Sequence, residues 1–187
     1  MRIIAGEFRS RKLLPPAGGV TRPITDRVKQ SVFDIVSPWL ESAVVCDLFA
    51  GTGSLGLESL SRGAASVTFY ESDRSALDRL QKNIASLAVQ DRCKIIRADV
   101  FSWFASAPEP ARRADLLFLD PPYAFLTDRA GDLTTLAAQI AAKHLSPKGL
   151  VVFRHDVGDR LDLPALRPLD IRDYGSMRVQ FLGKPDG

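Results

Sequence analysis

The sequence "AVVCDLFAGTGSLGLESLSRG", from Ala43 to Gly63, places an apolar run, a glycine-rich loop and a second apolar segment in immediate succession. The first run is short and apolar, which predicts a buried strand, and the second closes with a glycine, as helices commonly do. The loop between them contains Gly51, Gly53 and Gly56 in the spacing G-x-G-x-x-G. A strand, a glycine loop and a helix in this order occur in α/β folds that bind nucleotide cofactors. The stretch therefore predicts a Rossmann-like α/β fold.

The alternation of strand and helix patterns continues along the rest of the chain. Strands are predicted at residues 43–49, 66–71, 93–99, 115–120 and 149–155, the last entered through a turn at 146–149. Helices are predicted at residues 25–40, 54–63, 73–87, 100–106 and 132–145. Apolar strands that alternate with helices imply a mostly parallel sheet covered on both faces. Two last strands, 168–175 and 177–183, are joined by a tight turn and predict a hairpin, which gives one antiparallel strand in the edge region.

Length and composition indicate a single globular unit. A chain of 187 residues accommodates one domain with a substantial core. Its 45% hydrophobic and 25% charged residues are typical of soluble globular proteins. No apolar run is long enough to span a bilayer, and the N-terminal residues lack the apolar core of a signal peptide. We therefore expect a cytoplasmic protein without a membrane partner.

The cysteines and histidines indicate neither a disulfide nor a metal site. Cys46 and Cys93 lie inside apolar runs without C-x-x-C spacing, which favours small buried side chains. His144 and His155 belong to no metal-binding or nucleophile motif. The sequence therefore predicts no metal cofactor.

Positive charge is concentrated at the start of the chain. Residues 1–30 contain seven Lys and Arg against two acidic residues, a balance of +5, whereas residues 31–187 contain 18 against 20, a balance of −2. A basic flank on a nearly neutral body suggests a polyanionic partner, although a merely solvated face would have the same composition. The candidate RNA contacts are Arg9, Arg11, Lys12, Arg22 and Arg27.

Acidic residues at the ends of three successive predicted strands bear on the identity of the cofactor. Asp47 ends the first strand, Glu71 the second and Asp99 the third. In a dinucleotide site the glycine loop follows the strand directly and the helix N-terminus receives the pyrophosphate. A carboxylate at position 47 would repel a pyrophosphate, but it suits a cofactor with a sulfonium and an ammonium, such as S-adenosylmethionine (SAM). Glu71 can accept hydrogen bonds from ribose hydroxyls and Asp99 from an adenine amino group, and either could instead cap a helix.

The stretch "LLFLDPPYAF", residues 116–125, ends the fourth strand with a carboxylate, two prolines and an aromatic ring. Pro121 and Pro122 make a stiff segment whose carbonyls are free to accept hydrogen bonds, Asp120 adds a carboxylate, and Tyr123 adds a stacking face. This combination suits the exocyclic amine of a planar base. Orientation of that amine toward a methyl sulfonium should carry most of the rate, up to ~7–11 kcal/mol. Asp120 is the nearest acceptor for the proton that the amine then loses.

Three other functions are open at this point. An adenine-N6 methyltransferase acting on DNA or RNA could use the same tetrapeptide, although the chain contains no separate target-recognition domain. A dehydrogenase would need a nicotinamide site and a substrate domain, and the chain is short for both. A non-catalytic RNA-binding module would keep the cleft without the chemistry.

The segments "DLFAGTGSLGLE" and "LDPPY" resemble the class I SAM-dependent amino-methyltransferases. The segments "RIIAGEFRSRKL", "RPITDRVKQSVF", "LSRGAASVTFYESD" and "YGSMRVQF" are similar to those of one family among them, the bacterial RsmD-type enzymes, which methylate a guanine N2 in 16S rRNA. The resemblance covers nearly the whole chain, and Ile24 and Gln30 depart from the Thr and Glu usual in the family. It implies a seven-stranded methyltransferase sheet, a basic RNA-binding hairpin over residues 1–24 and a methyltransferase domain over residues 25–187.

The resemblance also implies site residues, a cofactor and a partner. The cofactor would be SAM, with S-adenosylhomocysteine as product, and the partner 16S rRNA, free or within an assembling small ribosomal subunit; we expect a monomer. The implied cofactor contacts follow SAM from its methionine part through ribose to adenine: Asp47, Gly51 and Gly53, then Glu71, then Asp99 with the Val100 amide. Further cofactor contacts are implied at Thr25, Phe49, Ala50 and Ser72. The target base would be held by Asp120, Pro121, Pro122 and Tyr123.

Overall fold

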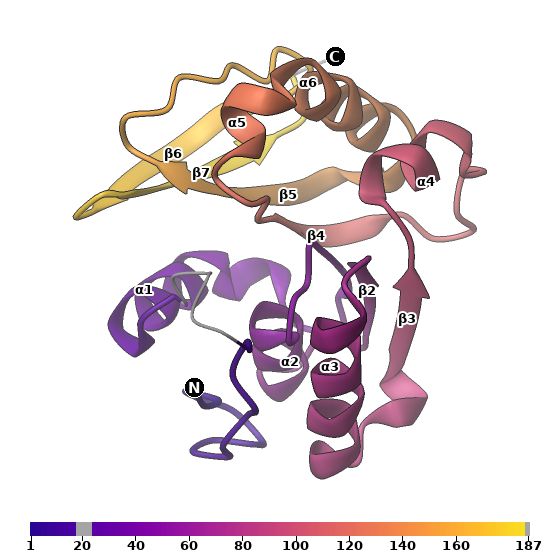
Figure 1. Ribbon diagram of the computed structural model, residues 1–187, viewed down its shortest axis with the longest axis vertical. Helices are drawn as coiled ribbons and strands as arrows, with labels where there is room; N and C mark the ends of the chain where they lie inside the picture. The colour runs from indigo at the N-terminus through magenta and orange to yellow at the C-terminus, as the bar shows by residue number, and fades with distance from the viewer. Residues whose placement is uncertain (18–23, 186–187) are drawn as a thin grey trace.

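The computed structural model describes residues 1–17 and 24–185, and a seven-stranded sheet forms its centre (Figure 1). The strands are β1 (Val44–Leu48), β2 (Ser66–Glu71), β3 (Cys93–Arg97), β4 (Ala114–Leu119), β5 (Leu145–Asp156), β6 (Arg167–Tyr174) and β7 (Met177–Gly183). They lie in the order β3-β2-β1-β4-β5-β7-β6. Because the order reverses between β1 and β4, the loops that leave these two strands diverge and open a crevice at their carboxyl ends.

Strands β1 to β5 run parallel, and β7 is antiparallel to both of its neighbours. The predicted mostly parallel sheet with an antiparallel strand in the edge region is therefore confirmed. The hairpin does not add its strands in chain order, because β7 lies between β5 and β6, and β6 forms the edge. Its two-residue turn is closed by the pair Tyr174 and Met177, and Gly175 in the turn has a φ of +64°.

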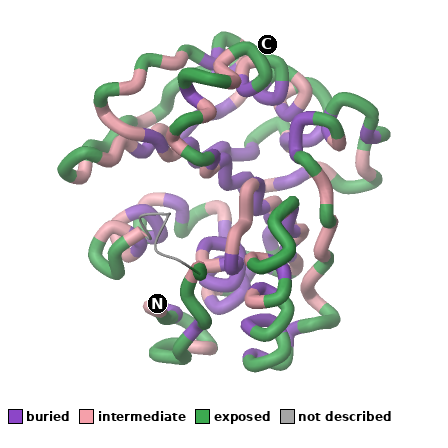
Figure 2. Tube along the Cα trace, in the orientation of Figure 1, coloured by how far each residue is buried: buried purple, intermediate pink, exposed green. Residues whose placement is uncertain are grey.

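Helices cover both faces of the sheet, as predicted. They are α1 (Asp26–Val36), α2 (Ser54–Ser61), α3 (Arg74–Leu87), α4 (Val100–Ser106), α5 (Phe125–Asp128) and α6 (Ala130–Gln139). In Figure 1 the first three lie below the sheet and the last three above it. Side chains along β4 alternate between the two cores: Leu116 and Phe118 pack with the first group of helices, Leu117 and Leu119 with the second. Figure 2 shows the resulting concentration of buried residues along the central strands.

The predicted helix over 132–145 is the least accurate of the sequence predictions. Helix α6 begins at Ala130 and ends at Gln139, and a π-helical turn over Ile140–His144 follows it. A separate short helix, α5, lies directly before α6. Strand β5 then begins at Leu145, and the predicted turn at 146–149 appears as a register shift within the β4–β5 pairing. The helix predicted over residues 25–40 is also shorter in the structure, because α1 ends at Val36 and a 3₁₀ turn follows it. Pro38 in that turn has no amide hydrogen, so it cannot donate the hydrogen bond that would continue the α-helix.

The N-terminal residues 1–17 form a compact loop that packs on α2 and α3. One isolated antiparallel bridge, between Arg2 and Lys12, represents the expected hairpin in the described part of the chain. Gly6 has a φ of +82°, and a Cβ there would lie 1.7 Å from the Ser61 carbonyl oxygen, so the chain approaches α2 at a point where only glycine fits. The segment is thus packed against the same helices that flank the glycine loop.

None of the helices in residues 1–17 and 24–185 is long and apolar enough to cross a membrane.

Candidate functional site

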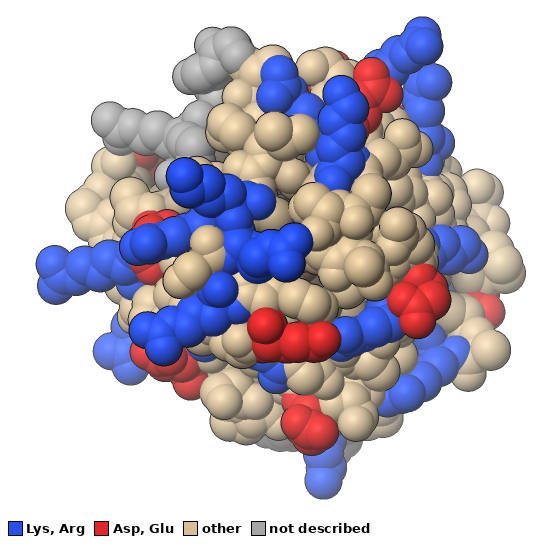
Figure 3. Space-filling view, turned by 90° about the horizontal axis from the view of Figure 1, so that it is seen from below, with Lys and Arg blue, Asp and Glu red and all other residues tan. Residues whose placement is uncertain are grey.

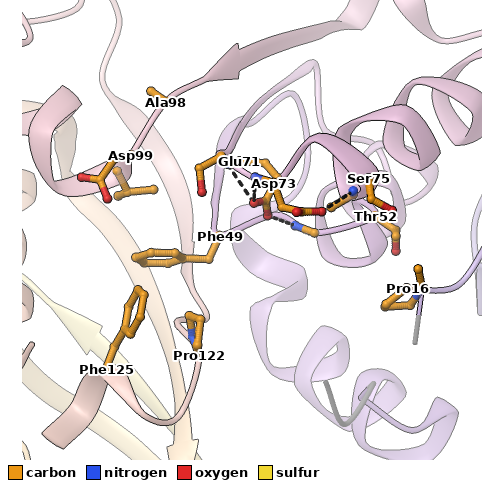
Figure 4. Close-up of a pocket in the computed structure, with 15 residues that line it drawn as sticks. Pro16, Phe49, Thr52, Glu71, Asp73, Ser75, Ala98, Asp99, Pro122 and Phe125 are labelled. Carbon is orange, nitrogen blue, oxygen red and sulfur yellow. Dashed lines mark hydrogen bonds between the residues drawn. The ribbon is translucent and has the colours of Figure 1, made fainter. Parts of the chain in front are cut away.

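A pocket of about 530 Å³ lies at the carboxyl ends of the parallel strands, where the topology predicts a ligand site (Figure 4). Its walls come from the glycine loop, the ends of β2 and β3, the start of α3, the segment after β4 and the end of the N-terminal segment. The lining residues are Pro16, Ala17, Phe49, Gly51, Thr52, Glu71, Ser72, Asp73, Ser75, Ala76, Ala98, Asp99, Val100, Pro122 and Phe125.

Glu71, the last residue of β2, fixes the glycine loop to the wall of this pocket. Its Oε2 accepts a hydrogen bond from the Gly51 amide at 2.7 Å, and its Oε1 accepts from the amides of Ser72 and Asp73, both at 2.8 Å. The loop itself contains Phe49 with a φ of +58° and Gly51 with a φ of +55°. The carboxylate therefore holds the loop in place and still faces the pocket, where its remaining lone pairs can accept from hydroxyl groups.

Asp47 is buried below the same loop. Asp47 is only 2% exposed, and its Oδ2 accepts a hydrogen bond from the Gly56 amide in the first turn of α2 at 2.9 Å. Burial raises the pKa of this carboxyl well above its usual range, and the Gly56 hydrogen bond works against that rise. A buried carboxylate beside a ligand pocket favours a cationic ligand group, since a cation would compensate the charge.

The far end of the pocket is aromatic. The rings of Phe49, Phe101 and Phe125 lie with centroids 5.6–6.0 Å apart, and the Arg129 guanidinium lies 3.9 Å from the centre of the Phe101 ring. Asp99 caps α4 by accepting from the Ser102 amide at 2.9 Å. It also accepts from Arg129 at 3.3 Å. This end of the pocket offers flat apolar walls with a carboxylate at the rim, which suits a heterocyclic base.

A second, smaller pocket of about 110 Å³ adjoins the first and shares Pro16, Phe49, Gly51 and Thr52 with it. Asp120, directly after β4, and Arg154 in β5 line it together with Asp47. Because Leu119 pairs with Phe153 in the parallel register, Asp120 and Arg154 are side by side. Arg154 donates from Nε to Oδ1 of Asp120 at 2.6 Å and from Nη2 to Oδ2 at 2.7 Å.

The structure brings most of the predicted site residues to these two pockets. The predicted residues that line one or both are Asp47, Phe49, Ala50, Gly51, Glu71, Ser72, Asp99, Val100, Asp120 and Pro122. The other four, Thr25, Gly53, Pro121 and Tyr123, do not line either pocket. Thr25 caps α1 by accepting from the Val28 amide at 3.3 Å, and Gly53, with a φ of +82°, packs against Leu80 and begins α2.

The predicted RNA contacts lie on the surface. Arg9, Arg11, Lys12 and Arg27 are exposed, and Arg22 lies outside the described residues. Figure 3 shows Lys and Arg side chains gathered near the middle of the face seen from below, the side on which the N-terminal segment lies in Figure 1.

Sequence reasoning missed several residues that line the two pockets, and three cases are instructive. Pro16 and Ala17 reach the larger pocket from the N-terminal segment, a placement that depends on tertiary packing. Phe125 lies only two residues after Tyr123, so its aromatic ring could have been included with the fourth-strand motif. Arg154 directly follows the apolar run "GLVVF" of a buried strand, and a charged residue in such a place indicates a buried partner of opposite charge. That signal was available in the sequence.

Comparison with known proteins adds a family to this geometry. The family described as Conserved hypothetical protein 95 matches residues 1–183. Ribosomal RNA small subunit methyltransferase D of Haemophilus influenzae is 40% identical over 129 residues, which cover 67% of this chain and 65% of that protein. The protein of the same name from Escherichia coli K12 is 39% identical over 123 residues, 66% of this chain and 60% of that protein.

Solved structures agree with the sequence comparison. The structure of yhhF from Escherichia coli superposes with a TM-score of 0.84 at 30% identity and covers 98% of this chain and 97% of that one. The match to the family extends from the N-terminal segment through β7, so it includes both pockets and the strands that carry them. This chain belongs to the Conserved hypothetical protein 95 family, the family of the RsmD-type methyltransferases.

Proposed function

We propose that this protein transfers a methyl group from SAM to the exocyclic N2 amine of a guanine in 16S rRNA. Curated relatives that are 39–40% identical carry the name ribosomal RNA small subunit methyltransferase D. The aligned segments cover 60–65% of those relatives, and the pockets described above supply an independent chemical argument. The reaction belongs in the bacterial cytoplasm, on rRNA that is free or already part of a small-subunit particle.

The larger pocket fits SAM in size and in the order of its chemical groups. At about 530 Å³ it lies within the range of about 300–1,000 Å³ typical of small-molecule sites. Glu71 suits the ribose hydroxyls, and Asp99 with Val100 suits adenine. The ammonium and sulfonium of the methionine part would lie toward Gly51, where Asp47 lines the adjoining smaller pocket. When bound, SAM supplies a methyl carbon whose bond to sulfur breaks as the nitrogen lone pair of the acceptor forms the new N–C bond.

The smaller pocket is where the target amine would meet that methyl group. Asp120 and Gly51 both line it, so an acceptor for the amine and the loop that borders the methionine part share one space. This is the observation that carries the proposal. The aniline-like amine of guanine is a weak nucleophile, and fixing its N–H groups on acceptors is the way in which this chain can orient its lone pair. Pro122, whose ring lines the larger pocket beside Phe125, stiffens the segment that presents Asp120.

The substitution Asp120→Ala tests this assignment. It removes the carboxylate acceptor and leaves the walls of the larger pocket in place, so methyl transfer to 16S rRNA should fall by at least about 10²-fold. The SAM dissociation constant, measured by calorimetry, should change by less than about threefold. Transfer is followed with labelled SAM and 16S rRNA as acceptor.

The matched control is Asp128→Ala, which removes an exposed carboxylate eight residues later on α5. Its methyl-transfer rate should equal that of the wild type. Normal transfer by the Asp120→Ala variant would contradict the assignment of Asp120 to the target amine, and loss of SAM binding in that variant would place Asp120 in the cofactor site instead.

A further inference from the structure

Arg154 forms a largely buried ion pair with Asp120 in the smaller pocket, and the reaction described above gives Arg154 no role. Its side chain is 14% exposed and that of Asp120 is 17% exposed. The contact is bidentate, with both carboxylate oxygens engaged at 2.6 and 2.7 Å. Two parallel N–H···O bonds of this kind fix the plane of a carboxylate, which a single bond does not.

The same pocket contains a second carboxylate, which makes the charge of Arg154 important. Asp47 lines the pocket beside Asp120, and burial raises the pKa of the Asp47 carboxyl, with repulsion from Asp120 adding to the rise. The positive charge of Arg154 opposes that rise. The guanidinium therefore compensates part of the negative charge of two carboxylates that line a space of about 110 Å³.

We propose, on the basis of the function proposed above, that Arg154 is a positioning residue for methyl transfer. Its guanidinium holds the Asp120 carboxylate in one orientation beside the glycine loop, so that Asp120 serves as a fixed hydrogen-bond acceptor for the target amine.

The lone pairs of Asp120 are sufficient for both partners. Each carboxylate oxygen can accept two hydrogen bonds, and Arg154 uses one site on each oxygen. The remaining sites can accept an N–H of the amine while the guanidinium stays in place. In this arrangement Asp120 contributes the orientation of the amine, and the proton released after transfer passes to solvent water, in place of the transfer to Asp120 that the sequence suggested.

The variants Arg154→Met and Arg154→Lys test the proposal against 16S rRNA methylation. Arg154→Met removes the charge and both hydrogen bonds, and kcat should fall by about 10²-fold, the cost of a reacting group displaced by about 1 Å. Arg154→Lys restores the charge without the planar fork, so it should recover part of the loss. The SAM dissociation constant should stay within about threefold in both. Arg160→Met, at an exposed position six residues later, is the control and should keep the wild-type rate.

Rescue by the conservative variant separates positioning from a merely structural effect. If Arg154 acts by orienting Asp120, Arg154→Lys should be more active than Arg154→Met while both bind SAM as the wild type does. An unchanged kcat in Arg154→Met would overturn the proposal, as would an Arg154→Lys variant that is no more active than Arg154→Met.

Nuclear magnetic resonance provides a test without turnover. The Arg154 Nε–H bound to Asp120 should exchange slowly with solvent in the wild-type protein, and the Asp120→Asn substitution should accelerate that exchange. The same background supplies a double-mutant cycle: Arg154→Met should cost less than about threefold in kcat when Asn replaces Asp120, because no charge is left to neutralise. If wild type transfers no methyl group, the proposed function fails. If it does, and the slow Nε–H or the partial rescue by Arg154→Lys is missing, only the role of Arg154 fails.

Discussion

A single buried carboxylate shows how function opposes stability at the scale of the residue. Asp47 is 2% exposed and burial raises its pKa well above the usual range, so keeping it charged near neutral pH destabilises the folded state. Its hydrogen bond from Gly56 needs only an oxygen, which a neutral amide would also provide. The charge is therefore not required by the local fold, and in the proposed function it serves the cationic part of the cofactor.

The substitution Asp47→Asn should make the protein more stable and a poorer SAM binder. The free energy of unfolding at pH 7 should rise by about 0.5–2 kcal/mol, the usual range for a stabilising substitution, because the cost of the buried charge is removed. In the wild type, Asp47 of the folded state stays protonated at pH values above about 3.9, the ordinary pKa of an aspartate. The contribution of Asp47 to stability is therefore complete below that pH and falls as the pH rises from there to the raised pKa. The stability advantage of the variant should accordingly grow as pH increases from about 4.

Urea unfolding at several pH values and SAM titration calorimetry provide the measurements. Asp78→Asn, at an exposed position on α3, is the control and should change neither quantity. A variant that is less stable than wild type, with SAM affinity retained, would show that Asp47 serves the fold and not the ligand.

At the scale of the element, the N-terminal segment is attached to α2 by a buried ion cluster. Glu58 is 0% exposed and accepts from the amides of Ile4 at 2.8 Å and Ala5 at 3.0 Å. It also pairs with Lys29 of α1 at 3.3 Å and Arg62 at 2.8 Å. Burial lowers the pKa of Lys29, and Glu58 opposes that effect.

Lys29 and a second polar side chain connect this segment to the glycine loop. Lys29 Nζ donates to the Arg2 carbonyl at 2.6 Å and to Ser54 Oγ, next to Gly53, at 3.3 Å. Asn83 of α3 accepts from the Leu14 amide at 2.7 Å and donates to the Thr52 carbonyl at 2.9 Å. The segment, α1 and the loop are therefore fixed relative to one another.

Removal of Glu58 should disrupt this attachment. Glu58→Ala leaves Lys29 buried without its anionic partner, and unfolding free energy should fall by about 3–5 kcal/mol. Replacing Lys29 by Met in the same protein should recover part of the loss, because the unpaired charge is gone. Chemical denaturation gives both values. Glu109→Ala, which breaks an exposed pair with Arg113, should leave the unfolding midpoint unchanged. An equally small effect at Glu58 would mean that the segment is held by other contacts.

At the scale of the whole molecule, the succession of strands and helices could be predicted because each strand and helix has its own local pattern. Strand β2 (Ser66–Glu71) contains the apolar residues Val67, Phe69 and Tyr70 and ends where predicted. Helix α3 has both an N-cap, Asp73, and a stripe of apolar residues on one face. The π-helical turn at Ile140–His144 and helix α5 had no such local signal, since they depend on how the chain packs above β4 and β5. The site divides in the same way: Asp47, Glu71 and Asp120 follow from their positions at strand ends, whereas Pro16 and Ala17 required the tertiary structure.

The basic N-terminal segment extends from the end of α2 to the larger pocket. Its turn at Glu7 packs on the end of α2, with the Glu7 amide donating to the Ser61 carbonyl at 2.7 Å, and Pro16 lines the pocket. A polyanion that contacts both the segment and the smaller pocket would therefore follow this face of the molecule. Such contacts depend on salt because they release counterions.

Replacing Arg9, Arg11 and Lys12 together by Gln should weaken binding to 16S rRNA. The slope of log affinity against log salt should decrease in magnitude by about 0.7–0.9 for each phosphate that the variant no longer neutralises. Filter binding at several salt concentrations measures both. The control replaces three exposed bases outside the segment, Lys143, Lys148 and Arg167, by Gln, which changes the net charge equally. If the two triple variants show the same decrease in affinity and in slope, the effect is one of net charge and the segment has no special role.

The identity of the modified atom tests the central claim most directly. The wild-type protein is incubated with labelled SAM and 16S rRNA, both free and in small-subunit particles prepared from cells that lack the enzyme, and the RNA is digested to nucleosides for mass spectrometry. The account predicts that the label appears in N2-methylguanosine, and that the Asp120→Ala variant produces none. Label in N6-methyladenosine, or no label in either form of the RNA while SAM binds normally, would contradict it.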